Sequence, residues 1–173
     1  MVLIELGGIK MKYGLALAAV ASLVASSAAQ AVQTDKRPLA ARVATSQEDA
    51  VKQVLARYKA AIERLDATGT EQLFAADSVI FETGVEGTYA NYLAHHLGPE
   101  LKAFKRFSFS DYKVEVRFEG PIALATETYN YRIETKSGEI VDRPGVATSV
   151  LKKIGGQWKI LSMHNSARRP RVS

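Results

Sequence analysis

The sequence predicts an α+β fold, in which a strongly curved antiparallel sheet wraps around helices that precede it in the chain. Apolar residues recur every three or four positions up to about residue 104, and they alternate with polar residues from Phe107 onward. Turn-forming residues divide the alternating part into four long runs, which is the pattern of an antiparallel meander. Such a sheet must bury one face, and the preceding helices are available to cover it. Long strands that curl around a helix enclose a cone-shaped cavity.

The helical half starts with a long amphipathic helix. Thr45 with Glu48, or Ser46 with Asp49, forms a capping box that predicts its first turn. Gly69 lies beyond its last turn and ends it. Its apolar face is formed by residues three or four positions apart: Val51, Val54, Leu55, Tyr58, Ile62 and Leu65.

Two shorter helices and a short strand follow. The second helix covers about residues 70–75, and an apolar triplet at 79–81 predicts the strand. The third helical stretch covers residues 89–104. Gly98 and Pro99 must break or kink it, because proline lacks the amide that would bond to the preceding turn.

Four long strands complete the predicted domain. They are expected over Phe107–Phe118, Ile122–Thr135, Ile140–Ile154 and Gln157–Ser166. Good turn sequences separate them: Glu119-Gly120-Pro121, Lys136-Ser137-Gly138 and Gly155-Gly156.

Residues 1–31 predict a secretory signal peptide. Met11 and Lys12 begin a positive segment, and residues 13–28 form an apolar run. Ala29-Gln30-Ala31 then places small residues where a signal peptidase reads them. The run is short for a membrane span, although an N-terminal membrane anchor is the alternative. We expect a periplasmic or secreted protein with no membrane span after cleavage, and Met11 is itself a good translation start.

The rest of the chain is expected to hold one domain. Residues 32–45 predict a flexible leader, residues 46–167 the domain and residues 168–173 a basic tail. With 47% hydrophobic and 24% charged residues, the chain has enough apolar material for a single core. The absence of cysteine excludes disulfides and thiol chemistry. The net charge of +5 is modest, and no dense basic stripe with interleaved aromatic residues predicts a nucleic-acid partner.

Three motifs resemble the nuclear transport factor 2-like superfamily, which includes SnoaL-like cyclases and ketosteroid isomerase. They are Arg57-Tyr58, the segment 73–77 (LFAAD) and the segment 155–160 (GGQWKI), and the resemblance covers about residues 46–167. The segment 89–96 (YANYLAHH), followed by Glu100 and by 164–166 (HNS), is similar to a bacterial exported branch of unassigned function. The superfamily includes enzymes, transport adaptors and plain binding domains, so the resemblance implies the fold rather than the reaction.

The resemblance to ketosteroid isomerase implies roles for three positions. Tyr58 takes the place of the oxyanion tyrosine, and Glu82 takes the place of the carboxylate base. A carboxylate in an apolar pocket has a raised pKa, which suits it for proton transfer near neutral pH. The position of the isomerase's protonated aspartate falls on Thr148, a weaker donor. The incomplete set argues against the isomerase activity itself. Alternatively, Tyr58 is a core aromatic residue and Glu82 an exposed loop carboxylate.

The histidines suggest a metal site as a further hypothesis. His96 and Glu100 are four residues apart on one helix face, and His164 lies near the end of the last strand. If they converge at the mouth of the pocket, His96, Glu100 and His164 form a two-histidine, one-carboxylate set suited to zinc. Alternatively, His96 and His164 line the pocket as hydrogen-bonding or acid–base groups while His95 is exposed.

Two arginines on neighbouring strands leave a choice open. Arg132 and Arg143 are placed to bind an acidic ligand. They are equally placed to pair across the strands with Glu127, Glu134 or Asp142.

Three functions fit these patterns. The first is a binding module for a small apolar or amphipathic molecule, without a cofactor. The second is a proton-transfer enzyme that uses Glu82 or His164 as base with Tyr58 as oxyanion donor. The third is a structural role in a homodimer that forms through the outer face of the sheet. In the first two, the expected ligand contacts are Phe81, Tyr92, His96, Tyr129, Thr148 and Trp158.

Overall fold

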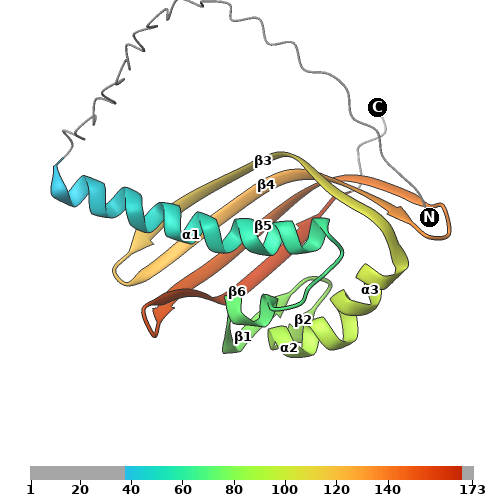
Figure 1. Ribbon diagram of the computed structural model, residues 1–173, viewed down its shortest axis with the longest axis horizontal. Helices are drawn as coiled ribbons and strands as arrows, with labels where there is room; N and C mark the ends of the chain where they lie inside the picture. The colour runs from blue at the N-terminus through green and yellow to red at the C-terminus, as the bar shows by residue number, and fades with distance from the viewer. Residues whose placement is uncertain (1–37, 169–173) are drawn as a thin grey trace, which may run out of the picture. The chain divides into compact units, whose positions relative to one another are not determined.

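The computed structural model describes residues 38–168. The predicted signal peptide, residues 32–37 of the predicted leader and most of the basic tail lie outside these residues. In chain order (Figure 1), the elements are α1 (Leu39–Glu63), the 3₁₀ helix η1 (Thr70–Leu73), β1 (Phe74–Phe81), β2 (Val85–Gly87), α2 (Tyr89–Tyr92), the π-helix η2 (Leu93–Leu97), α3 (Gly98–Ala103), β3 (Phe104–Glu119), β4 (Ile122–Thr135), β5 (Ile140–Ile154) and β6 (Gln157–Ala167).

The strands form one curved sheet in the order β2-β1-β6-β5-β4-β3. Neighbouring strands are antiparallel except β1 and β6, which run parallel. α1 lies along one face of the sheet, and α2 and α3 gather near the end of the sheet that the last turns of α1 approach (Figure 1). The predicted α+β fold is confirmed, and the parallel pair makes the sheet mixed rather than wholly antiparallel.

The long first helix starts earlier than the sequence indicated. α1 begins directly after Pro38, so residues 39–45 are helical and not part of a flexible leader. Proline is tolerated at the start of a helix but not in its interior, and good helix formers follow it here. The expected capping box is therefore wrong. The Thr45 hydroxyl donates instead to the Ala41 carbonyl at 2.9 Å, within the helix.

A β-bulge in β6 decides which of its side chains face α1. Val150 pairs with Ser162 and Leu151 pairs with Ile160, so Leu161 is an additional residue on β6. Side chains alternate along a strand, and one extra residue moves every later side chain to the other face. The residues of β6 that face α1 therefore have even numbers before the bulge and odd numbers after it.

A second bulge bends β3. Ser110 pairs with Asn130 and Lys113 pairs with Thr128, and Asp111 between them has a positive φ of 51°. The buried and half-buried residues change from odd to even numbers across this point. The two bulges contribute to the curvature that holds the inner face of the sheet around α1.

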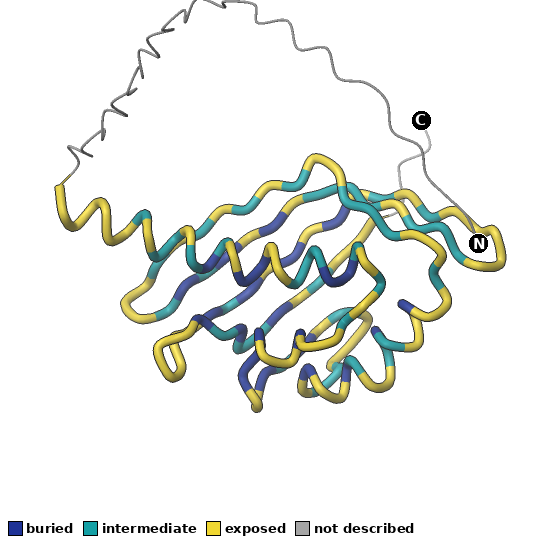
Figure 2. The backbone as a smooth tube through the Cα atoms, viewed as in Figure 1, coloured by how far each residue is buried: buried dark blue, intermediate teal, exposed yellow. Residues whose placement is uncertain are grey.

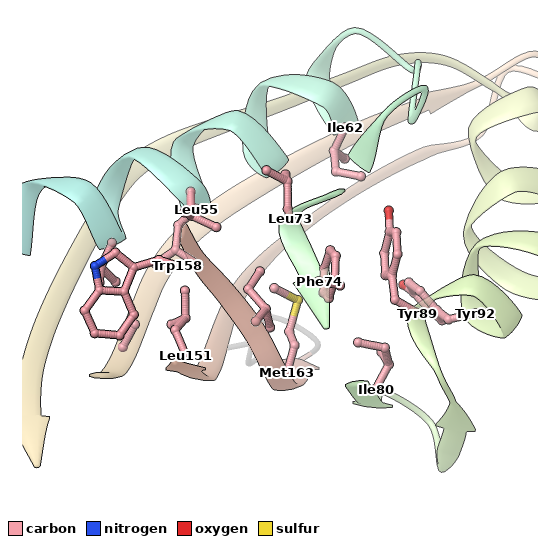
Figure 3. Close-up of a cluster of buried hydrophobic side chains, with 14 of the residues drawn as sticks. Leu55, Ile62, Leu73, Phe74, Ile80, Tyr89, Tyr92, Leu151, Trp158 and Met163 are labelled. Atoms are coloured by element: carbon pink, nitrogen blue, oxygen red, sulfur yellow. The ribbon is translucent and has the colours of Figure 1, made fainter. Parts of the chain in front are cut away.

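The hydrophobic core lies between α1 and the inner face of the sheet (Figures 2 and 3). α1 contributes a buried stripe that includes Val51, Leu55 and Ile62, close to the predicted face. β5 and β6 contribute alternate residues, among them Leu151 and Met163. Between residues 38 and 168, no helix combines the length and apolar character needed to cross a lipid bilayer.

Candidate active site

A cavity of about 420 Å³ lies where the last turns of α1 meet the α2–α3 region and the inner face of the sheet. Its size is within the usual range for sites that bind small molecules. Eleven of its lining residues are aromatic or aliphatic, and six are charged or polar. The wall is formed by Tyr58, Ile62, Glu82, Thr83, Tyr92, Leu97, Glu100, Phe104, Phe107, Phe109, Tyr129, Tyr131, Ile133, Arg143, Asn165, Ser166 and Ala167.

Glu82 and Tyr92 form the shortest carboxylate contact of this wall. Glu82 directly follows β1, and its N–H donates to the Gly84 carbonyl at 3.1 Å, which fixes the turn. The Tyr92 hydroxyl donates to Oε2 of Glu82 at 2.6 Å. Burial raises the pKa of Tyr92, and the neighbouring Tyr58 and Glu82 raise it further. Tyr92 therefore stays protonated and acts as a permanent donor to the carboxylate.

Three carboxylates surround His96, next to this pair. Nε2 of His96 lies 3.6 Å from Oε2 of Glu82 and 3.4 Å from Oε1 of Glu100, and Nδ1 lies 3.4 Å from Oε2 of Glu86. Burial alone would lower the pKa of His96, but the charges of Glu100 and Glu82 and the hydrogen bond with Glu86 raise it above its ordinary value. Burial raises the pKa of Glu100. The cluster can therefore hold and exchange protons at the edge of the cavity.

A π-helical turn keeps His96 and Glu100 on one face. The Gly98 N–H donates to the Leu93 carbonyl, and a Cβ atom at position 98 would lie 2.5 Å from that carbonyl oxygen. Only glycine fits this close approach. The wider turn precedes Pro99, and the helical segment continues from α2 to the end of α3 without the predicted break. The glycine and proline thus preserve the register that the sequence suggested they would disrupt.

Tyr58 reaches the cavity from the last turns of α1. Its ring packs edge-on against Phe74, with ring centroids 5.3 Å apart, and against Tyr89 at 5.9 Å. Phe74 of β1 and Tyr89 of α2 stack with ring centroids 3.7 Å apart (Figure 3), and the Tyr89 hydroxyl shares a 2.7 Å hydrogen bond with Thr70. Burial raises the pKa of Tyr58 well above its ordinary value. Tyr58 is therefore a fixed, protonated hydrogen-bond donor.

A buried carboxylate lies in a small side compartment of about 40 Å³, which Tyr58 and Tyr129 also line. Glu127 projects inward from β4 and is 6% exposed, and the Tyr112 hydroxyl donates to its Oε2. Burial raises the pKa of Glu127, and the hydrogen bond from Tyr112 only partly opposes this. Among residues 38–168, Glu127 has no cationic partner. Glu127 is therefore easier to protonate than an exposed carboxylate.

The structure brings part of the predicted site together. Tyr58, Glu82, Tyr92 and Tyr129 line the one cavity, and His96 lies beside Glu82. Glu86, which contacts His96 from β2, was not predicted from the sequence. Glu127 was predicted only as an ion-pair partner for the arginines on the neighbouring strands. Glu127 could have been found by its parity, because it alternates with Tyr129 and Tyr131 on β4.

Three predicted residues lie on the outer face of the sheet instead. His164 is exposed and pairs in the strand register with Phe81 on one side and Thr148 on the other. The bulge at Leu161 is the cause, because it turns Asn165 toward the cavity and His164 away from it. The expectation that Phe81, Thr148 and His164 contact a ligand in the central cavity is wrong.

Trp158 is also misplaced by the sequence prediction. It faces inward, but it packs on Phe118 at 5.8 Å and lines a separate groove beside the first turns of α1. Figure 3 shows Trp158 at one end of the core and Tyr92 at the other.

The proposed metal set does not assemble. His164 faces away from His96 and Glu100, and no group of three or more His, Asp or Glu side chains within residues 38–168 is placed to hold a metal ion.

Comparisons with known proteins agree with this architecture. Residues 51–170 match the SnoaL-like domain family. A nuclear transport factor 2-like superfamily protein from Salmonella enterica matches with a TM-score of 0.64 at 20% identity, over 75% of this chain and 94% of its own. A proposed scytalone dehydratase from Novosphingobium aromaticivorans matches with a TM-score of 0.65 at 14% identity, over 75% and 89%. These two likenesses show the fold alone.

A third structure is more similar in sequence. A proposed ketosteroid isomerase from Shewanella frigidimarina is 29% identical, with a TM-score of 0.57, over 68% of this chain and 94% of its own. No functionally curated protein matches the sequence. The fold and the similar solved structures support a domain that binds a small ligand or catalyses a reaction on one.

Proposed function

Because this chain belongs to the SnoaL-like domain family, within the nuclear transport factor 2-like superfamily that its sequence resembles, we propose that it moves a proton on a small, largely apolar molecule held in the central cavity. Glu82 is the proposed base. The observation that carries the proposal is the 2.6 Å hydrogen bond from Tyr92 to Glu82, made at the cavity wall beside His96. This arrangement favours turnover over binding alone, because it presents a carboxylate with its own proton-exchanging partner to the ligand.

The chemistry requires a carbon acid next to a carbonyl group. Glu82 takes the proton from that carbon, the electron pair of the broken C–H bond forms the C=C bond of an enolate, and the carbonyl π pair moves onto the oxygen. Tyr58, which burial keeps protonated, donates a hydrogen bond to this oxygen as negative charge develops there. Glu127 lies in the adjoining side compartment and is not part of the cavity wall, so Tyr58 is the only oxyanion donor that we propose. Glu82 then returns the proton to the same carbon or to another, and His96 supplies an alternative route for it to solvent.

The test is exchange of solvent deuterium into an enolisable ketone of suitable size. Purified protein is incubated in D₂O with 2-tetralone, and loss of the proton signal next to the carbonyl is followed by NMR. A general base contributes about 10²- to 10⁴-fold to a rate, so Glu82→Gln should lose at least about 10²-fold. Tyr58→Phe should lose a comparable amount, since single oxyanion donors contribute about 10²- to 10³-fold. An unchanged rate in Glu82→Gln, with the ketone still bound, would return the protein to the class of binding modules.

We also propose that the protein is exported after removal of residues 1–31, as the signal-like sequence suggests. N-terminal sequencing of protein recovered from the periplasm or the medium should begin at Val32. A protein that retains Met1 or Met11 would contradict this.

A homodimer through the outer face of the sheet is proposed on the exposure of apolar side chains there. Val146 is 46% exposed and Phe81 is 36% exposed, on the face that also carries His164. Sedimentation velocity should show a dimer that Val146→Glu weakens, because the substitution places charge in the apolar contact. A monomer at every concentration tested would exclude it.

A further inference from the structure

The two arginines on neighbouring strands lie in different surroundings. Arg132 and Asp142 form an exposed ion pair at 3.0 Å between β4 and β5. Arg143 follows Asp142, so its side chain emerges on the opposite face, beside Tyr131, where it lines the central cavity. Within residues 38–168, Arg143 has no carboxylate partner. The choice that the sequence left open is resolved separately for each arginine.

The carboxylates that share the cavity with Arg143 are already engaged. Glu82 accepts a hydrogen bond from Tyr92, and both Glu82 and Glu100 form ion pairs with His96. The Arg143 guanidinium contacts the Tyr131 hydroxyl instead. Burial raises the pKa of Tyr131, and the charge of Arg143 partly opposes this, so Tyr131 remains a neutral neighbour and does not balance the charge.

Arg143 and Glu82 reach the cavity from different strands. Arg143 lies on β5, whereas Glu82 directly follows β1. Tyr131, which the Arg143 guanidinium contacts, also feels the negative charges of Glu82 and Glu100, and these help to raise its pKa. The cavity therefore carries one positive group among its negative ones.

We propose that the ligand of this cavity is an amphipathic acid, whose anionic group binds Arg143 and whose apolar body lies against the aromatic wall. A half-buried guanidinium without a carboxylate partner is unfavourable, and a carboxylate can satisfy it with two parallel hydrogen bonds. Glu82 and Glu100 line the same cavity and repel an anion, so the acid group is held directly against Arg143. This inference deepens the proposed function, on which it rests for the identity of the site.

The test compares two probes that have the same shape and differ in charge: 1-naphthaleneacetate and 1-naphthaleneacetamide. Isothermal titration calorimetry at low salt should show the anion binding at least about tenfold more tightly to the unmodified protein, as expected for a charge-assisted hydrogen bond. Arg143→Gln should reduce this preference to about one. Arg143→Lys, which keeps the charge and loses the planar fork, should retain part of it.

Arg132→Gln is the matched control, because it removes an arginine from the neighbouring strand on the opposite face, and it should leave the preference intact. Equal affinity of the unmodified protein for both probes, or an undiminished preference in Arg143→Gln, would overturn the inference. If Arg143→Gln fails to fold, Arg143→Lys is measured in its place. A lysine variant that binds the anion as tightly as the unmodified protein, with the same preference over the amide, would overturn the inference. If neither probe binds the unmodified protein, both this inference and the proposed role of the cavity are contradicted. If the two probes bind equally well, only the preference for an anion is contradicted.

Discussion

The hydroxyl of Tyr92 donates a 2.6 Å hydrogen bond to Oε2 of Glu82 at the wall of the central cavity. The bond joins α2 to the turn that follows β1, two segments that the chain separates by the short strand β2. Because Tyr92 is 3% exposed and burial raises its pKa, the donor cannot turn to water or ionise near neutral pH. Glu82 is thereby held in one orientation, toward the space in which a ligand would lie.

We expect the stability of the protein to depend on pH through His96. Its carboxylate neighbours raise its folded-state pKa above the ordinary value of 6.5, in spite of the opposing effect of burial. The stabilisation is therefore fully present below pH 6.5 and is lost as the pH rises through the raised value. Urea unfolding of the unmodified protein and of His96→Gln should differ more at pH 6 than at pH 9. His95→Gln, on the adjacent residue, should show no such change, and a pH-independent difference for His96→Gln would contradict the assignment.

Glu127 should show a dependence of the same sign in the acidic range. Burial raises its pKa, so the folded state holds the proton more tightly than the unfolded state. Stability falls as the pH rises from the unfolded value near 4.3 to the raised folded value, by about 1.4 kcal/mol for each pKa unit between them. Glu127→Gln has no such loss, so it should gain stability over the unmodified protein across that interval, measured by urea unfolding. Glu115→Gln, on the exposed face of β3, is the control, and a Glu127→Gln variant that is less stable at pH 8 would refute a raised pKa for Glu127.

Gly145 provides the space for the ring of Tyr129. A Cβ atom at position 145 would lie 2.4 Å from Cε2 of Tyr129, and that ring is also packed against Phe109, with centroids 5.0 Å apart. Gly145→Ala must displace the ring into the cavity and should destabilise the protein by about 1–3 kcal/mol in urea unfolding. The same substitution in a Tyr129→Ala background should destabilise it much less, because the clash is absent. Equal losses in both backgrounds would show that the strand itself, and not the ring, rejects the side chain.

The arrangement of elements was predictable because the sequence encodes it locally. The four long strands appear close to their predicted bounds, since alternation and glycine-rich turns specify both their faces and their ends. The helix start at Leu39 was missed because a plausible cap at Thr45 was preferred over the proline that precedes a run of helix formers. The continuous segment through Gly98 was missed because a π-turn needs the close approach of glycine to Leu93, which only coordinates reveal.

The site was less predictable than the fold because it depends on register. The bulge at Leu161 contains no glycine or proline, so counting by twos continued past it and placed His164 on the wrong face. Trp158 was assigned to the correct face of the sheet. The sequence does not indicate which end of α1 a residue of β6 packs against, and Trp158 lies beside the first turns of α1. Glu86 and His96 are ten residues apart and meet only because the β2 turn folds back on η2, where the Asn91 side-chain amide donates to the Glu86 carbonyl at 2.7 Å.

The most direct measurement compares Glu82→Gln with Glu86→Gln in the deuterium-exchange assay on 2-tetralone. Both carboxylates lie within 3.6 Å of His96, and only Glu82 lines the cavity. If Glu82 is the base, its variant loses at least about 10²-fold in exchange rate, whereas Glu86→Gln stays within about threefold of the unmodified protein. Equal losses in the two variants, or a greater loss in Glu86→Gln, would contradict the assignment of Glu82 as the group that takes the proton.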